Sequence, residues 1–217
     1  MPSSSFRLLA QQTLLSLLSL TTALVTPSPY EGLVPRDVTL ADGTIAVVYE
    51  NPALTFHKIR DADVLPSTLT KRLQYITYAT PAAGRNDYCG EWNTVVSGGP
   101  DAPLASDCSA IAQAYTIQTS LGASGALGYW SISVADWNAA PGGWVTLAAS
   151  GTCKFPVALS SGQPVQNALF GANDLRFYTN SAVGSAVGGK SEARGSVSCW
   201  NGTDGHFVST AFRVTHV

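Results

Sequence analysis

Charged side chains are scarce in this chain of 217 residues, which has 12 Lys and Arg, 14 Asp and Glu, and a formal net charge of -2. Without a basic surface field, nucleic-acid binding and polybasic attachment to a membrane have no electrostatic support. Low charge combined with 45% hydrophobic residues favours a folded chain. Its 20 glycines and 12 prolines, set between short β-rich runs, are typical of a turn-rich β or α+β domain.

The N-terminus has no clean apolar run of the roughly 18 to 20 residues that a transmembrane helix needs. Its apolar stretch is interrupted by Gln11, Gln12 and Ser16. Arg7, the apolar residues 14–20 and the small residue Ala23 instead follow the three-part layout of a secretory signal peptide. We therefore predict that residues 1–23 are a signal peptide and that the protein is secreted to the extracellular space.

Residues 24–72 contain no cysteine and end on Lys71 and Arg72, a dibasic pair of the kind that processing proteases of the secretory route cleave. In one interpretation residues 24–72 are a pro-peptide, and the mature domain comprises residues 73–217. In the other, the basic pair is an ordinary solvated one, and the strand-like residues 44–49 pack permanently on the domain. The sequence favours neither interpretation.

The cysteines lack the spacing of a metal site. Cys89, Cys108, Cys153 and Cys199 are separated by 19, 45 and 46 residues and include no C-x-x-C pair, so we expect no metal. An even number of cysteines behind a signal peptide indicates two disulfides. The sequence alone allows three connectivities.

Local patterns predict an α+β fold: a small disulfide-stapled domain with an antiparallel sheet and two helices. Ser106 is the expected N-cap of a first helix, whose apolar spacing is set by Cys108, Ile111, Ala112 and Tyr115. Asn173 and Asp174 are suited to cap a second helix starting at Leu175.

Strands are expected where aromatic and β-branched residues gather. The expected strands are residues 129–134, 144–149, 152–157, 195–200 and 207–214. The first two flank Pro141-Gly142-Gly143, which reads as a turn between them.

Motifs for catalysis are incomplete. Residues 184–191 match the phosphate-binding pattern G-x-x-x-x-G-K-[ST], but Gly195 and Cys199 follow where that motif needs a long helix, so we predict no nucleotide binding. No spacing of carboxylates singles out a glycosidase pair, and Asp107 and Asp174 stand where helix caps are expected. We therefore predict that the protein is not an enzyme and has no cofactor.

Five tryptophans are many for a domain of this size, and most are expected in the core or beside the cysteines. Trp92 and Trp137, near loops rich in glycine and asparagine, are the candidates for a platform that binds a sugar or a partner. Asn201-Gly202-Thr203 is an N-x-[ST] acceptor, and we predict a glycan on Asn201.

The cysteines lie within recognisable motifs. These are Asp87-Tyr88-Cys89-Gly90, Ser106-Asp107-Cys108, Ser150-Gly151-Thr152-Cys153-Lys154-Phe155, Phe170-Gly171-Ala172-Asn173-Asp174-Leu175 and Ala193-Arg194-Gly195-Ser196-Val197-Ser198-Cys199. In order and spacing they resemble the fungal extracellular-protein-two family, which comprises secreted, necrosis-inducing effectors of plant-associated fungi. The resemblance covers residues 87–200. It departs from the family at Pro156, where a glycine is usual, and in the Gly/Ser/Ala-rich residues 181–189.

The resemblance implies disulfides that pair Cys89 with Cys199 and Cys108 with Cys153. It implies a virulence effector that provokes necrosis in a host or antagonises other microbes, with no catalytic site. Such domains are also similar to small viral killer toxins of smut fungi, which have an α/β sandwich fold and interfere with membrane channels; this likeness is one of fold alone.

The target is then a host or microbial protein, a membrane channel or a cell-wall polysaccharide, and not a nucleic acid or nucleotide. Two other function classes stay open from the residues themselves. One is a cell-wall carbohydrate-binding module, and the less favoured one is a secreted hydrolase.

Overall fold

A computed structural model describes residues 28–58, 88–115, 128–203 and 206–217 of the chain. Within these residues the structure has two antiparallel sheets, of seven and three strands. The seven-stranded sheet consists, in spatial order, of β1 (Val34–Thr39), β2 (Ile45–Glu50), β6 (Val145–Ser150), β7 (Cys153–Leu159), β10 (Phe207–His216), β9 (Glu192–Trp200) and β4 (Cys89–Ser97). The smaller sheet consists of β3 (Thr55–Lys58), β5 (Gly128–Ile132) and β8 (Ala168–Gly171).

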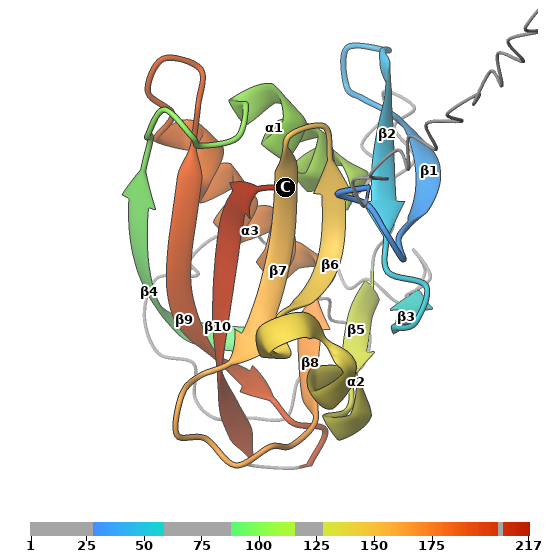
Figure 1. The fold of residues 1–217 in the computed structure, drawn as a ribbon, viewed down its shortest axis with the longest axis vertical. Coiled ribbons are helices and arrows are strands. Elements are labelled where there is room, and N and C mark those ends of the chain that lie inside the picture. Colours follow the sequence, from blue (N-terminus) through green and yellow to red (C-terminus); the bar gives the residue numbers. More distant parts are fainter. Residues whose placement is uncertain (1–27, 59–87, 116–127, 204–205) are drawn as a thin grey trace, which may run out of the picture.

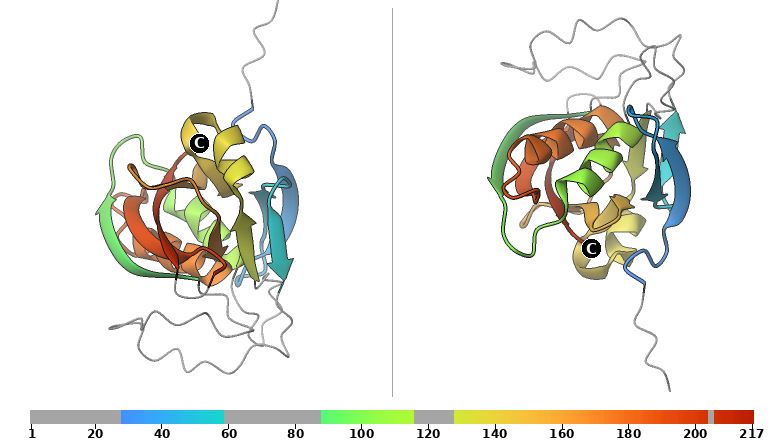
Figure 2. Two further views of the ribbon diagram at one scale, coloured as in Figure 1. Left: turned by 90° about the horizontal axis from the view of Figure 1, so that it is seen from below. Right: turned by 90° about the horizontal axis from the view of Figure 1, so that it is seen from above.

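Two main helices cover one face of the large sheet. These helices, α1 (Ala105–Ala114) and α3 (Ala172–Gly184), lie side by side behind the strands (Figures 1 and 2). A shorter helix, α2 (Val134–Ala139), and a 3-10 turn at Pro141–Gly143 join the small sheet to β6. No helix in the described part of the chain is both long and apolar enough to cross a membrane. The α+β prediction of an antiparallel sheet with two helices is confirmed.

The core lies between the helices and the large sheet. Along β7, Cys153, Phe155 and Val157 point toward the helices and are fully buried, as the alternation of a strand requires. Phe155 stacks on Phe212 of β10 with ring centroids 5.8 Å apart, and Phe212 in turn stacks on Tyr178 of α3 at 4.4 Å. These aromatic contacts hold helix α3 against the large sheet.

Residues 28–58 belong to this fold. An Asp42-Gly43 turn joins β1 to β2, and Tyr49 and Glu50 of β2 pair with β6. Val38 and Val48 of this hairpin are buried, at 1% and 0% exposure. Figure 2 shows the hairpin beside α1, on the side away from α3. The described residues of segment 24–72 thus pack on the domain, while Lys71 and Arg72 lie outside the described residues, so that cleavage there stays a prediction.

The carboxylate of Glu50 links this hairpin to the core. Its Oε1 accepts hydrogen bonds from the Tyr115 hydroxyl at 2.8 Å and from Arg36 Nε at 2.9 Å. Burial, and then the negative charge of Glu50, raise the pKa of Tyr115 well above its usual value. The end of α1 is therefore held to the hairpin by a polar contact as well as by apolar packing.

Two local predictions were wrong. Ser106 is not an N-cap, because α1 begins at Ala105 after Leu104 and has no side-chain cap hydrogen bond. Residues 129–134 and 144–149 do not form a hairpin, because β5 and β6 belong to different sheets and α2 lies between them. That helix begins with a capping box, in which Asp136 N–H donates to Ser133 Oγ at 3.3 Å and Ser133 N–H donates to Asp136 Oδ2 at 2.6 Å.

Candidate functional site

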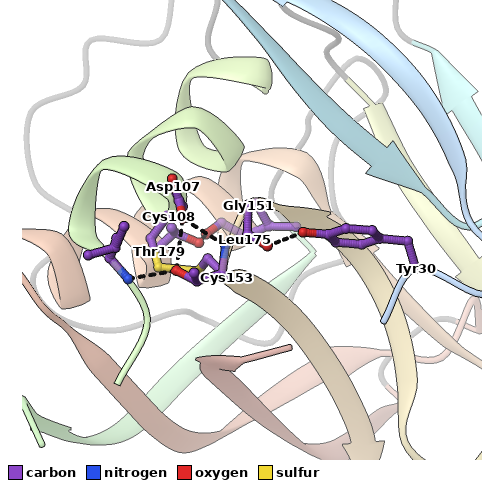
Figure 3. The surroundings of a disulfide bond; sticks show 9 residues. Tyr30, Asp107, Cys108, Gly151, Cys153, Leu175 and Thr179 are labelled. Carbon is purple, nitrogen blue, oxygen red and sulfur yellow. Dashed lines mark hydrogen bonds between the residues drawn. A yellow bond between two sulfur atoms is a disulfide. The ribbon is translucent and has the colours of Figure 1, made fainter. Parts of the chain in front are cut away.

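The first disulfide, Cys108–Cys153, fastens α1 to the start of β7. Next to it, Asp107 Oδ2 accepts hydrogen bonds from the Thr152 N–H at 2.7 Å and the Thr152 hydroxyl at 2.8 Å (Figure 3). Thr152 Oγ1 also accepts from the Leu104 N–H at 2.8 Å. The Asp107 carboxylate therefore hydrogen-bonds to the turn before β7 and does not cap helix α1.

This turn is shaped by Gly151, whose φ is +50°. A Cβ at this position would lie 2.4 Å from the Asp107 carboxylate, so no other residue fits without displacing that group. The Tyr30 hydroxyl donates to the carbonyl oxygen of Gly151 from the opposite side (Figure 3). Tyr30 also stacks on Tyr49 at 4.0 Å, so the N-terminal segment contacts the disulfide region directly.

The second disulfide, Cys89–Cys199, joins β4 and β9 at directly paired positions. The fully buried Asp174, in the first turn of α3, supports it. Asp174 Oδ2 accepts from three backbone N–H groups: Tyr88 at 2.7 Å, Cys89 at 3.1 Å and Gly171 at 3.1 Å. Helix α3 begins at Ala172 after the N-cap Gly171, and not at Leu175 as predicted, so Asp174 is a residue of the first turn that accepts from the N-cap N–H instead of being the N-cap. The other two bonds fasten the start of β4 to α3.

Burial raises the pKa of the Tyr88 hydroxyl to about 12, with further contributions from Tyr129 and the Asp174 carboxylate. Tyr88 packs on Tyr129 at 4.4 Å and on Trp200 at 6.2 Å. The residues that flank the second disulfide, Tyr88 and Trp200, are thus both aromatic; Tyr88 is buried and Trp200 is partly buried.

Each disulfide is therefore paired with an aspartate in the first turn of a helix. Asp174 accepts a hydrogen bond from the N–H of Cys89 itself, and Asp107 accepts one from the N–H of Thr152, the residue before Cys153. The described cysteines are all disulfide-bonded, in the pairing that the resemblance implies. This arrangement stabilises the domain wherever disulfides persist, which is outside the reducing cytosol.

Of the two tryptophans predicted to bind a sugar or a partner, only Trp137 has a described side chain, and it is buried. Trp137 is 4% exposed, and its Nε1–H donates to the Gln166 carbonyl at 2.9 Å, so its ring belongs to the core. For Trp92 only the backbone, within β4, is described. Trp144, which no sequence pattern distinguishes from the other tryptophans, is the partly exposed indole that lines a cavity.

The cavity beside Trp144 has a volume of about 690 Å³. It lies where the N-terminal segment, α2 and the last strand meet, and both basic and acidic residues line it. Arg213 lies over the Trp144 ring, with its guanidinium carbon 4.2 Å from the ring centroid. Lys154, Glu31 and Asp136 also line the cavity.

The phosphate-loop pattern has a different structural context from the one its chemistry needs. Gly184 ends helix α3, and strand β9 follows at Glu192, so the order is helix, loop, strand instead of strand, loop, helix. Lys190 Nζ donates to the Pro100 carbonyl. The described residues contain no group of three or more His, Cys, Asp or Glu suited to hold a metal ion.

The predicted glycan acceptor lies just after β9. Asn201 Oδ1 accepts from the Thr203 N–H at 2.9 Å, and its Nδ2 lies 3.3 Å from Gln166 Oε1. Asn201 is half-buried and Thr203 is exposed. Modification of this side chain stays a prediction.

Comparison with known protein families matches residues 88–199 to the Hce2 family, described as "Pathogen effector; putative necrosis-inducing factor". A search of curated proteins found no match. The matched segment begins one residue before Cys89 and ends at Cys199, so it contains both disulfides and both supporting aspartates. Because the match covers just over half of the sequence, the chain belongs to the Hce2 family of pathogen effectors.

Proposed function

We propose that this protein is a secreted effector that acts outside the cell that makes it and provokes the death of host cells. The observation that carries this proposal is the coincidence of the family match with the disulfide-bonded unit, since residues 88–199 contain all four cysteines. A disulfide-bonded domain behind a signal-like N-terminus suits an oxidising extracellular environment.

The proposed activity requires no catalysis. The carboxylates most favourably placed for chemistry have structural partners: Asp107 binds Thr152, Asp136 caps α2, and Asp174 binds three backbone N–H groups. An effector of this kind acts by binding, so its specificity lies in its exposed surface. Antagonism of competing microbes by the same surface is the second biological role that the family resemblance suggests.

The test is infiltration of the purified, oxidised protein into the intercellular space of leaves, with ion leakage as the readout. We expect cell death that depends on dose. The control is the same protein reduced and alkylated, which has the same sequence and lacks the disulfides. Absence of leakage with folded protein across a panel of plants would contradict the proposal, as would equal leakage with the alkylated control.

A parallel experiment separates the two biological roles. Growth of fungi and bacteria is followed in the presence of the same preparations. Growth inhibition without leaf necrosis would replace the host-directed role by the antimicrobial one. Release of sugars or acids from cell-wall polymers during either experiment would contradict the non-catalytic proposal.

A further inference from the structure

The face of the large sheet opposite α1 and α3 carries a row of cations. Arg194 of β9 and Arg213 of β10 are directly paired in the ladder, so their side chains leave the same face. Lys154 of β7 pairs with Thr215, two residues from Arg213, and therefore lies diagonally next to it on that face. In Figure 1 this face is turned toward the viewer, away from the two long helices.

These cations have acidic residues nearby but no ion-pair partner in the described part of the chain: Glu31 and Asp136 line the cavity together with Arg213 and Lys154. None of Arg194, Arg213 and Lys154 forms an ion pair within the described part of the chain, although Arg36 does so with Glu50. Like charges directly opposite each other on antiparallel strands destabilise a sheet. Two directly paired arginines therefore form a local cationic patch on this face, in a chain whose net charge is -2.

Two features give the part of this cationic row around Arg213 the shape of a binding site. Trp144 holds the Arg213 guanidinium by a cation–π contact at 4.2 Å, and a stacked guanidinium keeps its planar fork available for a carboxylate. Pro156 lies opposite Arg213 in the register and has no N–H to donate, so the pairing of β7 with β10 is interrupted between Lys154 and Val157. Pro156 lines the cavity together with Arg213, Lys154 and Trp144.

From these observations we infer that the cavity beside Trp144 binds an acidic polysaccharide, with uronate carboxylates on Arg213 and Lys154, which line the cavity, and with the sugar chain continuing along the sheet face to Arg194. The volume of about 690 Å³ is that of a site for a molecule larger than a single phosphate or sulfate ion. Neighbouring strands are about 4.8 Å apart, so the cations are spaced for carboxylates that repeat along a chain. This inference goes beyond the proposed function, because binding to a wall polymer does not require cell-death activity.

The lining favours a sugar chain over an anionic membrane. Glu31 and Asp136 line the same cavity, and Thr146 and Thr215 supply hydroxyl groups. Carboxylates and hydroxyls match the hydroxyl groups of a sugar, which both donate and accept hydrogen bonds. A continuous layer of lipid phosphates would instead meet Glu31 and Asp136 with like charge. The site therefore suits a ligand in which carboxylates alternate with hydroxyl groups.

Affinity electrophoresis of the full-length secreted protein tests this inference, with polygalacturonate as the probe in the gel. Fully methyl-esterified polygalacturonate is the matched polymer, since it keeps the sugar chain and lacks the charge. We expect saturable binding of the free acid, no binding of the ester, and weakening in high salt because exposed charges are screened.

Variants locate the site. Arg213→Gln is expected to weaken binding by about tenfold or more, since it removes a charge-assisted contact. Arg213→Lys keeps the charge and loses the planar fork, and is expected to give an intermediate loss. Lys190→Gln is the control with the same change of net charge, at a lysine already bonded to Pro100, and is expected to leave binding unchanged. Near-ultraviolet circular dichroism verifies that each variant is folded.

Several results would overturn the inference: no retardation by polygalacturonate, equal retardation by the ester, or equal weakening by Lys190→Gln and Arg213→Gln. Binding to phosphatidylserine vesicles in place of the polymer would overturn it in favour of a membrane ligand. Leaf necrosis is scored separately, so loss of polymer binding with retained necrosis affects this inference alone.

Discussion

The carboxylate of Asp174 and the backbone N–H of Cys89 are 3.1 Å apart, although 85 residues separate them in the sequence. The same oxygen accepts from the N–H groups of Tyr88 and Gly171, so one buried atom joins the start of β4, the Cys89–Cys199 disulfide and the first turn of α3. The aspartate in the Asn173-Asp174 motif of the family is thus a structural residue of this disulfide-bonded unit.

Asp174→Ala is expected to destabilise the domain by at least about 3 kcal/mol, because it leaves three N–H groups without their acceptor, each at a cost of roughly 1–3 kcal/mol if it stays buried. Urea unfolding of the oxidised protein measures the loss. Asp107→Ala is the matched control: its site is only partly buried, so water can replace the lost acceptor and a smaller loss is expected. Equal effects of the two substitutions would contradict this account of Asp174.

Alkaline pH is expected to destabilise the fold through Tyr88 and Tyr115. Both have a pKa raised in the folded state, Tyr88 to about 12, so the folded protein holds these protons more tightly than the unfolded chain. Their contribution is complete below pH of about 10, the pKa of an unperturbed tyrosine, and is lost as pH rises toward 12. The urea midpoint against pH measures this, with ultraviolet absorbance reporting tyrosine ionisation.

Tyr88→Phe is the control for the alkaline transition. It removes one of the two groups, and it is expected to make stability less sensitive to pH between about 10 and 12. An unchanged slope in this variant would show that Tyr88 does not contribute. Because hydroxide attacks disulfides over time, thiol content is measured on every alkaline sample.

Cleavage after Arg72, if it occurs, is expected to give two chains that stay together. Both disulfides lie within residues 89–199, so neither crosses the cut. The β2–β6 pairing, buried Val48 and the Glu50–Tyr115 hydrogen bond hold the N-terminal hairpin in place without a covalent bond. The cut protein should therefore elute as one species in size-exclusion chromatography and separate into two on a non-reducing denaturing gel.

A cut protein that loses its N-terminal piece and yet stays folded and monomeric would contradict this prediction. It would establish residues 24–72 as a removable pro-peptide. A denatured preparation of the same cut protein serves as the reference for complete separation.

The sequence predicted those elements whose signals are local. The helix around Cys108 and the strands around Phe155, Val197 and Val208 follow from apolar periodicity. A capping box at Ser133 and Asp136 and an Asp42-Gly43 turn were also present, and could have indicated α2 and the β1–β2 hairpin.

Local sequence patterns do not show which distant residue a side chain contacts in the folded protein. Asp107 resembles a helix cap in the sequence, but its partner is Thr152, 45 residues away. The Trp144–Arg213 contact likewise depends on the pairing of distant strands. Trp137 is buried, contrary to the predicted platform, and its Nε1–H donates to the carbonyl of Gln166, 29 residues away, a contact that no local pattern encodes.

The Cys108–Cys153 disulfide is expected to contribute about 4 kcal/mol to stability in the chain-entropy model, since it joins cysteines 45 residues apart. That is comparable to the whole stability of a small domain, about 5–15 kcal/mol. Cys108→Ser with Cys153→Ser should therefore unfold at much lower urea and lose necrosis activity, whereas Ser106→Ala, at an exposed side chain with no cap hydrogen bond, should retain both stability and activity. Full activity of the double variant would contradict a role for this disulfide.

The central claim, an exported chain held by two disulfides, is tested most directly by the intact mass of the secreted protein, measured before and after reduction with alkylation and after deglycosylation. We predict a chain lacking residues 1–23 with two disulfides, all four cysteines alkylated only after reduction, and a glycan lost from Asn201. Free thiols in the secreted protein, or an intact N-terminus beginning at Met1, would contradict the account.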